Sequence, residues 1–321
     1  MKKGLKAAGI VLAIAALAYF GRHAWRTLEG QDLSVLTEGP GLAGMLLLVL
    51  LYTASLATTS AAWLWQLRAL GQPASYAWTT SVLAVTQFGK YLPGNVGQHI
   101  GRVGLAVGAG VRLSAALLTL GYELLIAIVA AAHLGAAAVL LWPPAAFAGA
   151  SWLNYRWPLL VTVTLGALAG LLLAPRLVVL LLRMRSPASP AVEASSFRLD
   201  LRAIAGSYVM YLSSLLAIGL GLWVLALALL PGDVAMPTPL FFVGAFAVSW
   251  IAGFVVPGAP AGLGVRELVL TAWLGDALPA TTVVVLVLAL RVATTIGDAI
   301  NFGWGSWALA RRRTDPMRER G

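Results

Sequence analysis

The chain has 321 residues, of which 60% are hydrophobic and only 11% are charged. This composition excludes an ordinary soluble domain and indicates a helical membrane protein that crosses the bilayer several times. Cysteine is absent, which excludes disulfides and cysteine-based metal sites, and the three histidines share no ligand spacing. The formal net charge of +10 is carried by loops and tails, as the positive-inside bias of membrane proteins predicts. We therefore expect no metal, no cofactor and no nucleic-acid partner.

Six apolar runs are long enough to cross a hydrocarbon core of roughly 30 Å. The predicted membrane spans are 5–20, 41–65, 114–141, 158–175, 203–230 and 281–309. The first run follows Lys2, Lys3 and Lys6, as in a signal peptide, but Arg22 stands close to where a small-residue cleavage site would be expected. This pattern predicts a retained anchor helix.

Two further apolar stretches, 78–112 and 239–276, are interrupted near their middle. Each has an apolar limb, a Pro-Gly interruption and a Gly-rich second limb, and each limb is too short for a comfortable crossing. Irregular backbone is tolerated at membrane depth only where it is buried in protein or lines a cavity. We therefore predict two re-entrant hairpins, each built from a broken helix.

The two interruptions carry the same ten-residue pattern, once in each half of the chain. The copies are PGNVGQHIGR at 93–102 and PGAPAGLGVR at 257–266, and both open with Pro-Gly and end with Arg. Paired interruptions in two halves point to the binding site of an inverted-repeat transporter. The predicted motif turns lie at Pro93, Gly94, Gly97, Pro257, Gly258, Gly262 and Gly264.

Loop charges decide the predicted orientation. Arginines in 176–202 and in the C-terminal tail, together with the N-terminal lysines, place these segments in the cytoplasm, whereas 143–157 and 231–238 are poor in Lys and Arg and should face outward. Arg22 and Arg26 fall on the outer side and count against this assignment. Six crossings satisfy the loop charges only if both hairpins return to the side from which they entered.

The predicted fold is therefore an all-α, polytopic membrane bundle forming a single domain over 1–321. It has two inverted repeats near 41–141 and 203–309, each with a re-entrant hairpin, and a basic cytoplasmic loop near 176–202. Both termini are expected in the cytoplasm and the protein in the plasma membrane, the inner membrane of a bacterium.

Seven ionisable side chains lie within or beside the apolar segments: Lys90, Arg102, Glu123, Arg266, Glu267, Arg291 and Asp298. Such groups usually face a cavity or pair with one another, because an isolated charge at bilayer depth is costly. The arginines favour an anionic ligand, since guanidinium matches phosphate bidentately, and Asn95 and Gln98 are further candidates for headgroup contacts. The alternative is structural, because buried ion pairs can fix helix register without touching a ligand.

Glu123 and Arg291 occupy equivalent places in the two repeats, each about ten residues into the span that follows a motif. A contact between them across the pseudo-two-fold axis is therefore a further hypothesis. In that arrangement Arg102 and Arg266 would bind phosphate with help from Lys90, while the acidic residues would balance the charge.

At FGKYLPGNVGQ (88–98) and PGAPAGLGVRE (257–267) the chain resembles a known family. It is similar to the flippase-like membrane domain of lysylphosphatidylglycerol synthases, which also occurs as stand-alone proteins. The resemblance implies movement of a phospholipid or lipid-linked sugar between leaflets. It does not imply synthesis of lysyl-lipid, because the aminoacyl-transferase domain is missing, and Ala259-Pro260-Ala261 departs from the Gly-rich turn often seen in the family.

The function predicted from the sequence is that of a flippase-like transporter, not an enzyme. Its substrate would be an anionic phospholipid, a polyprenyl-phosphate or a polyprenyl-phospho-sugar, and a homo-oligomer is left open. Two alternatives stay open as well: a membrane enzyme of lipid or glycolipid synthesis that uses Glu123 or Glu267, and a non-transporting subunit of a membrane assembly.

Overall fold

The structure is a computed structural model that describes residues 18–29, 34–91, 96–147, 149–185, 200–230, 235–256 and 259–314, and in these ranges it is helical without a strand. Five helical stretches are long and apolar enough to cross a membrane: Gly39–Ala69, Leu113–Leu141, Ser151–Leu173, Leu201–Leu229 and Ala280–Arg311. They coincide with five of the six predicted spans. The predicted span 5–20 lies outside the described residues except for 18–20, which belong to a helix over 18–28.

The α-helices, in chain order, are α2 (Gly39–Ala69), α3 (Tyr76–Thr86), α4 (Gly97–Gly108), α5 (Leu113–Leu141), α6 (Arg156–Arg185), α7 (Leu201–Leu229), α8 (Pro239–Val255), α9 (Val265–Leu274) and α10 (Ala280–Thr314). Short 3₁₀ helices join them: η1 (Ser34–Leu36), η2 (Gln87–Tyr91), η3 (Ala145–Phe147), η4 (Ser151–Tyr155) and η5 (Pro260–Gly262).

Local chemistry explains several helix starts. Ser75 caps α3 by accepting a hydrogen bond from the amide of Trp78, and Asp200 caps α7 through the amide of Arg202. Pro40 in α2 and Pro239 in α8 stand in the first turn, where a missing N–H costs nothing. These residues fix where α2, α3, α7 and α8 begin.

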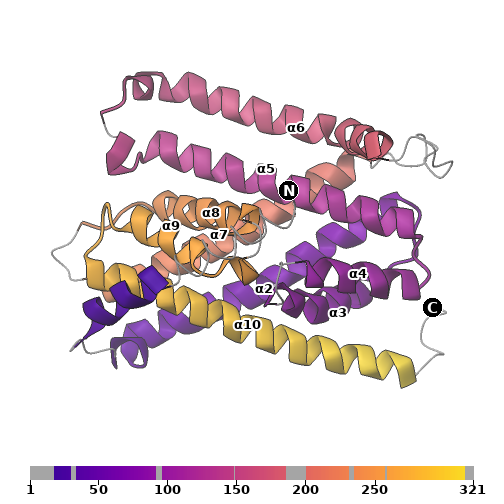
Figure 1. Cartoon of the computed structure of the whole chain (residues 1–321), viewed down its shortest axis with the longest axis horizontal. Helices are drawn as coiled ribbons and strands as arrows, with labels where there is room; N and C mark the ends of the chain where they lie inside the picture. Colours follow the sequence, from indigo (N-terminus) through magenta and orange to yellow (C-terminus); the bar gives the residue numbers. More distant parts are fainter. Residues whose placement is uncertain are drawn as a thin grey trace.

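The centre of the bundle is the pair α2 and α7, which pack closely along their length (Figure 1). Glycines permit the close approach: a Cβ atom on Gly44 would lie 3.1 Å from Cα of Leu225, and one on Gly221 would lie 3.0 Å from Cδ1 of Leu48. Small residues at such contacts are typical of helix pairs in membranes, where packing rather than water drives association.

The two halves of the chain exchange their packing partners around this pair. Helix α10 from the second half packs on α3 from the first, and α5 from the first half packs on α8 from the second. In the same way α10 packs on α2 and α5 packs on α7. If α2, α3 and α5 are taken as the counterparts of α7, α8 and α10, each of these contacts between the halves has a matching contact in the other direction.

Both predicted hairpin segments consist of two packed helices on either side of the motif. In the first, α3 and η2 are followed by α4, and α3 packs on α4; in the second, α8 is followed by η5 and α9, and α8 packs on α9. Positive φ angles at Ala261 (49°), Gly262 (72°) and Gly264 (81°) make the second turn tight, a backbone shape for which glycine is suited.

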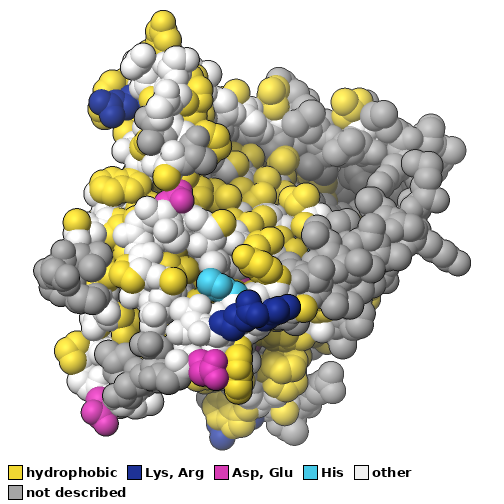
Figure 2. Space-filling model, turned by 60° about the vertical axis from the view of Figure 1, so that its left-hand side comes forward, with side chains coloured by type: hydrophobic (Ala, Val, Ile, Leu, Met, Phe, Trp, Pro, Cys, Tyr) yellow, Lys and Arg dark blue, Asp and Glu magenta, His cyan; other side chains and the backbone are white. Residues whose placement is uncertain are grey.

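Helix α6 lies on the outside of the bundle beside α5 (Figure 1). It extends to Arg185, so the first ten residues of the loop predicted at 176–202 are helical, while 186–199 lie outside the described residues. His133 of α5 links α5 to α6 and α7, because its ring nitrogens contact Thr164 of α6 and Tyr208 of α7. On the face in Figure 2, hydrophobic side chains are widespread among the described residues and charged ones are scattered, as suits a membrane protein.

Candidate functional site

A cavity of about 180 Å³ lies inside the bundle, between the two halves of the chain. Its polar lining residues are Tyr52, Ser55, Thr59, Gln87, Lys90, Gln98, His99, Arg102, Glu123, Tyr211, Ser214, Arg266 and Thr294. Its apolar lining residues come mainly from α5, α7 and α8, and those of α8 are Phe246, Trp250 and Phe254. The cavity is therefore amphipathic and receives residues from both motif segments.

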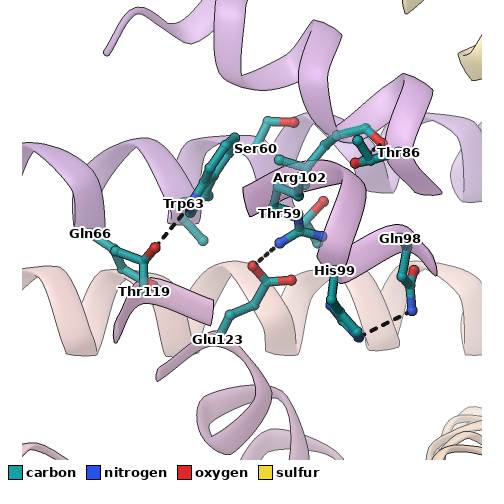
Figure 3. Close-up of polar contacts among 12 residues, drawn as sticks. Thr59, Ser60, Trp63, Gln66, Thr86, Gln98, His99, Arg102, Thr119 and Glu123 are labelled. Carbon is teal, nitrogen blue, oxygen red and sulfur yellow. Dashed lines mark hydrogen bonds and ion pairs between the residues drawn. The ribbon is translucent and has the colours of Figure 1, made fainter. Parts of the chain in front are cut away.

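Arg102 occupies the first-half side of the cavity and is paired. It is buried in α4, and its Nη1 donates to Oε2 of Glu123 on α5 (Figure 3). Its guanidinium carbon lies 5.5 Å from the ring centre of Trp63, whose indole N–H in turn donates to Thr119. A carboxylate and an aromatic ring thus hold this arginine in place.

Lys90 belongs to a second cluster centred on Asp298 of α10. The Lys90 ammonium lies 2.6 Å from Oδ2 of Asp298, which also accepts a hydrogen bond from Tyr91, and Oδ1 accepts one from Tyr52. Lys90 also donates to the Tyr52 hydroxyl at 2.8 Å. Asp298 is only 2% exposed, so its negative charge is balanced inside the protein by Lys90 and two phenol groups.

The third pair joins α9 to α10. Nε of Arg291 donates to Oε1 of Glu267 at 2.5 Å, and Nη2 of Arg291 contacts the same oxygen. The hypothesis of a contact between Glu123 and Arg291 is therefore wrong: Glu123 pairs with Arg102 and Arg291 with Glu267. In each case the partner lies on the neighbouring short helix of the same half.

Arg266 differs from these three cations. Among the described residues it forms no ion pair, whereas each of the other three does. Like Lys90 and Arg102 it lines the cavity, and like that of Arg102 its Nε is buried without a hydrogen-bond partner. Two glycines make room for its stem: a Cβ on Gly253 would lie 2.5 Å from Cγ of Arg266, and one on Gly262 would lie 2.8 Å from its Nε. The backbone of α8 and of the motif turn thus packs directly against the side chain of Arg266.

The charges of the cluster do not balance within the described part of the chain. Glu123, Glu267 and Asp298 are each matched by one cation, and the guanidinium of Arg266 is left over. A cation without a counter-charge in an apolar bundle is unfavourable unless water or an anion reaches it. The cavity provides the space for either.

The remaining predicted residues are distributed as follows. Gln98 lines the cavity and contacts His99 at 3.3 Å, and Gly97 is the first residue of α4. Gly262 and Gly264 form the tight turn before α9. Asn95, Pro93, Gly94, Pro257 and Gly258 lie outside the described residues.

Several residues at the site were not predicted from the sequence. Ser55 and Thr59 of α2 line the cavity one helical turn apart, and this spacing of hydroxyls on one face was a usable signal. Tyr52 and Tyr211 show the same kind of spacing, three residues before Ser55 and Ser214. Gly253 carried no such signal, because its role depends on which side chain lies opposite. In the described ranges no group of His, Asp and Glu is arranged to hold a metal ion.

No protein-family model matches the chain, and no curated protein matches it either.

Proposed function

We propose that the chain is a membrane transporter that moves the anionic headgroup of a lipid, or of a lipid-linked sugar, between the leaflets. The observation that carries the proposal is Arg266, a cation left without a counter-charge among the described residues and facing a polar cavity inside a bundle of apolar helices. A phosphate group matches a guanidinium in charge and in bidentate geometry.

The two kinds of wall suit an amphiphilic molecule. Arg266 would hold the phosphate, and hydroxyl groups such as those of Ser55 and Thr59 would bond the rest of the headgroup. The apolar wall at Trp250 and Phe254, whose rings stack at 5.5 Å, would face the lipid chains. A small soluble anion has no apolar part that could contact these aromatic side chains.

The proposal includes an inverted repeat with two re-entrant hairpins, α3–α4 and α8–α9. The exchange of packing partners between the halves supports it, as does the convergence of Gln98, Arg102, Ala261 and Arg266 on one cavity. Rocking of one half against the other would expose such a site to each leaflet in turn. The ion pair of Arg102 with Glu123 would then open and close on one side of the headgroup. The chain would lie in the inner membrane with both termini in the cytoplasm.

The enzyme alternative would use Glu123 or Glu267 as a free acid or base. Each carboxylate is held by an arginine, which is why transport is the function that we propose. Purified protein in liposomes separates the classes: headgroup movement without covalent change supports the transporter, formation of a product supports the enzyme, and neither result supports a non-transporting subunit.

Native mass spectrometry of lipids that co-purify from the host membrane tests the site itself. We expect the wild-type protein to retain an anionic lipid and Arg266→Gln to lose it. The matched control is Arg156→Gln, because Arg156 is an exposed arginine on α6 that does not line the cavity. Equal retention by wild type and Arg266→Gln would contradict the proposal.

A further inference from the structure

The long helix that follows each motif carries a charged residue at an equivalent position, and the sign of that charge differs between the two halves. In the first half, Arg102 of α4 pairs with Glu123 of α5. In the second half, α10 carries Arg291 at the equivalent position along the helix, and Arg291 pairs with Glu267, the residue that follows the motif arginine in the chain. The position that supplies a carboxylate to Arg102 in the first half is thus occupied by a cation, Arg291, in the second half.

Arg266 and Glu267 line a second, small cavity that shares Phe246, Arg266 and Thr294 with the main cavity. This second cavity, of about 20 Å³, is lined by Arg266, Glu267, Arg291 and Thr294 together with Ser249 and apolar residues of α8, α9 and α10. Oε2 of Glu267 and Nε of Arg266 are both buried without a hydrogen-bond partner. The volume is about that of one water molecule, so an unused acceptor and an unused donor lie around the same small gap.

We propose that Arg291 is a positioning residue: from α10 it binds Glu267 of α9 and thereby keeps Arg266 available to the anionic headgroup. The inference rests on the proposed function, because it concerns the same anion site. Arg291 does not line the main cavity. It acts by engaging the carboxylate that lines the same small cavity as Arg266 and that would otherwise compete with a phosphate for it.

The physical reason is the cost of a buried carboxylate without a partner. Loss of the Arg291 charge leaves Glu267, which is 4% exposed, with an uncompensated negative charge in a medium of low dielectric constant. Arg266 is then the nearest cation lining the same gap, and the two charges attract each other strongly. Glu267 would occupy the guanidinium from inside, and the headgroup would lose its binding partner although Arg266 itself is intact.

A merely structural ion pair predicts a different response. If the Arg291–Glu267 pair only joined α9 to α10, Arg291→Gln would lower the thermal midpoint, because it leaves Glu267 without a partner. The protein that stays folded would keep its lipid, because Arg266 would stay free. If the pair keeps Arg266 free, the double variant restores the site, because no carboxylate is left to compete. The comparison of the single and double variants therefore separates the two roles.

The experiment uses full-length protein purified from the host membrane, with bound anionic lipid counted by native mass spectrometry. Four variants are compared with wild type: Arg266→Gln, Arg291→Gln, Arg291→Gln with Glu267→Gln, and Arg156→Gln as the exposed control. We expect Arg291→Gln to lower lipid occupancy about tenfold or more, and the double variant to return it to near the wild-type level. Thermal unfolding of each variant in detergent shows that the protein is folded.

The outcomes distinguish this inference from the proposed function. If wild type and Arg266→Gln carry the same lipid, the anion site itself is wrong. If Arg266→Gln loses the lipid while Arg291→Gln keeps it, the anion site stands and the role of Arg291 is refuted. Failure of the double variant to recover lipid, with the protein folded, refutes it equally and assigns the pair to helix packing.

Discussion

Substitution of Gly253 by alanine should displace Arg266 without unfolding the protein. A Cβ atom at Gly253 would lie 2.5 Å from Cγ, 2.7 Å from Nε and 3.1 Å from Cδ of Arg266. Carbon atoms in contact are ordinarily about 3.5–4.0 Å apart, so the added methyl group and the arginine stem cannot share this space. The three atoms belong to a flexible side chain and not to backbone, so the arginine is the part that moves.

The expected energies differ between stability and binding. Overpacking of this kind costs about 1–3 kcal/mol, while alanine in place of glycine inside a helix returns about 1 kcal/mol. The net loss of stability is therefore about 0–2 kcal/mol. A displaced guanidinium loses charge-assisted hydrogen bonds to phosphate worth about 1.5–3 kcal/mol, which corresponds to about 10- to 150-fold weaker binding.

The assay measures anionic lipid retained by purified protein, together with the thermal midpoint in detergent. Gly104→Ala is the matched control, because Gly104 stands on the short helix α4 of the other half and nothing lies within 4 Å of a Cβ placed there. Lipid retention should fall in Gly253→Ala and stay unchanged in Gly104→Ala. Wild-type retention by a folded Gly253→Ala protein would refute the assignment of Arg266 as the headgroup ligand.

Two further predictions concern the Asp298 cluster and the topology. Asp298→Asn should lower stability by about 3–5 kcal/mol, because it removes the charge that balances the buried Lys90 and that accepts hydrogen bonds from Tyr52 and Tyr91. Asp276→Asn, at an exposed carboxylate that accepts a hydrogen bond from the amide of Ala145, should change the thermal midpoint little. Equal midpoints in the two variants would count against the cluster. The chain has no native cysteine, so Arg318→Cys in the C-terminal tail, outside the described residues, introduces a single thiol. Impermeant thiol reagents applied to intact cells should not label it. Labelling from outside would contradict a cytoplasmic C-terminus.

The sequence by itself determined the helices that are apolar enough to cross a membrane. The runs that become α2, α5, α7 and α10 are visible because a helix in lipid must satisfy its own backbone hydrogen bonds, so each long apolar run has one available structure. The repeated Pro-Gly pattern also indicated Arg102 and Arg266, since spacing along the chain is a sequence property. The inverted orientation of the repeats stays a prediction.

Only the tertiary structure decided which charges are neighbours. Equivalent places in two repeats suggested that Glu123 meets Arg291, yet each pairs within its own half, because α4 packs on α5 and α9 on α10. Gly253 beside Arg266 had no sequence signal, because the need for a missing side chain depends on what lies opposite. An ion pair or a close contact needs two helix faces that pack on each other. The spacing of residues along one helix shows which of them share a face, but it does not show which other helix that face contacts.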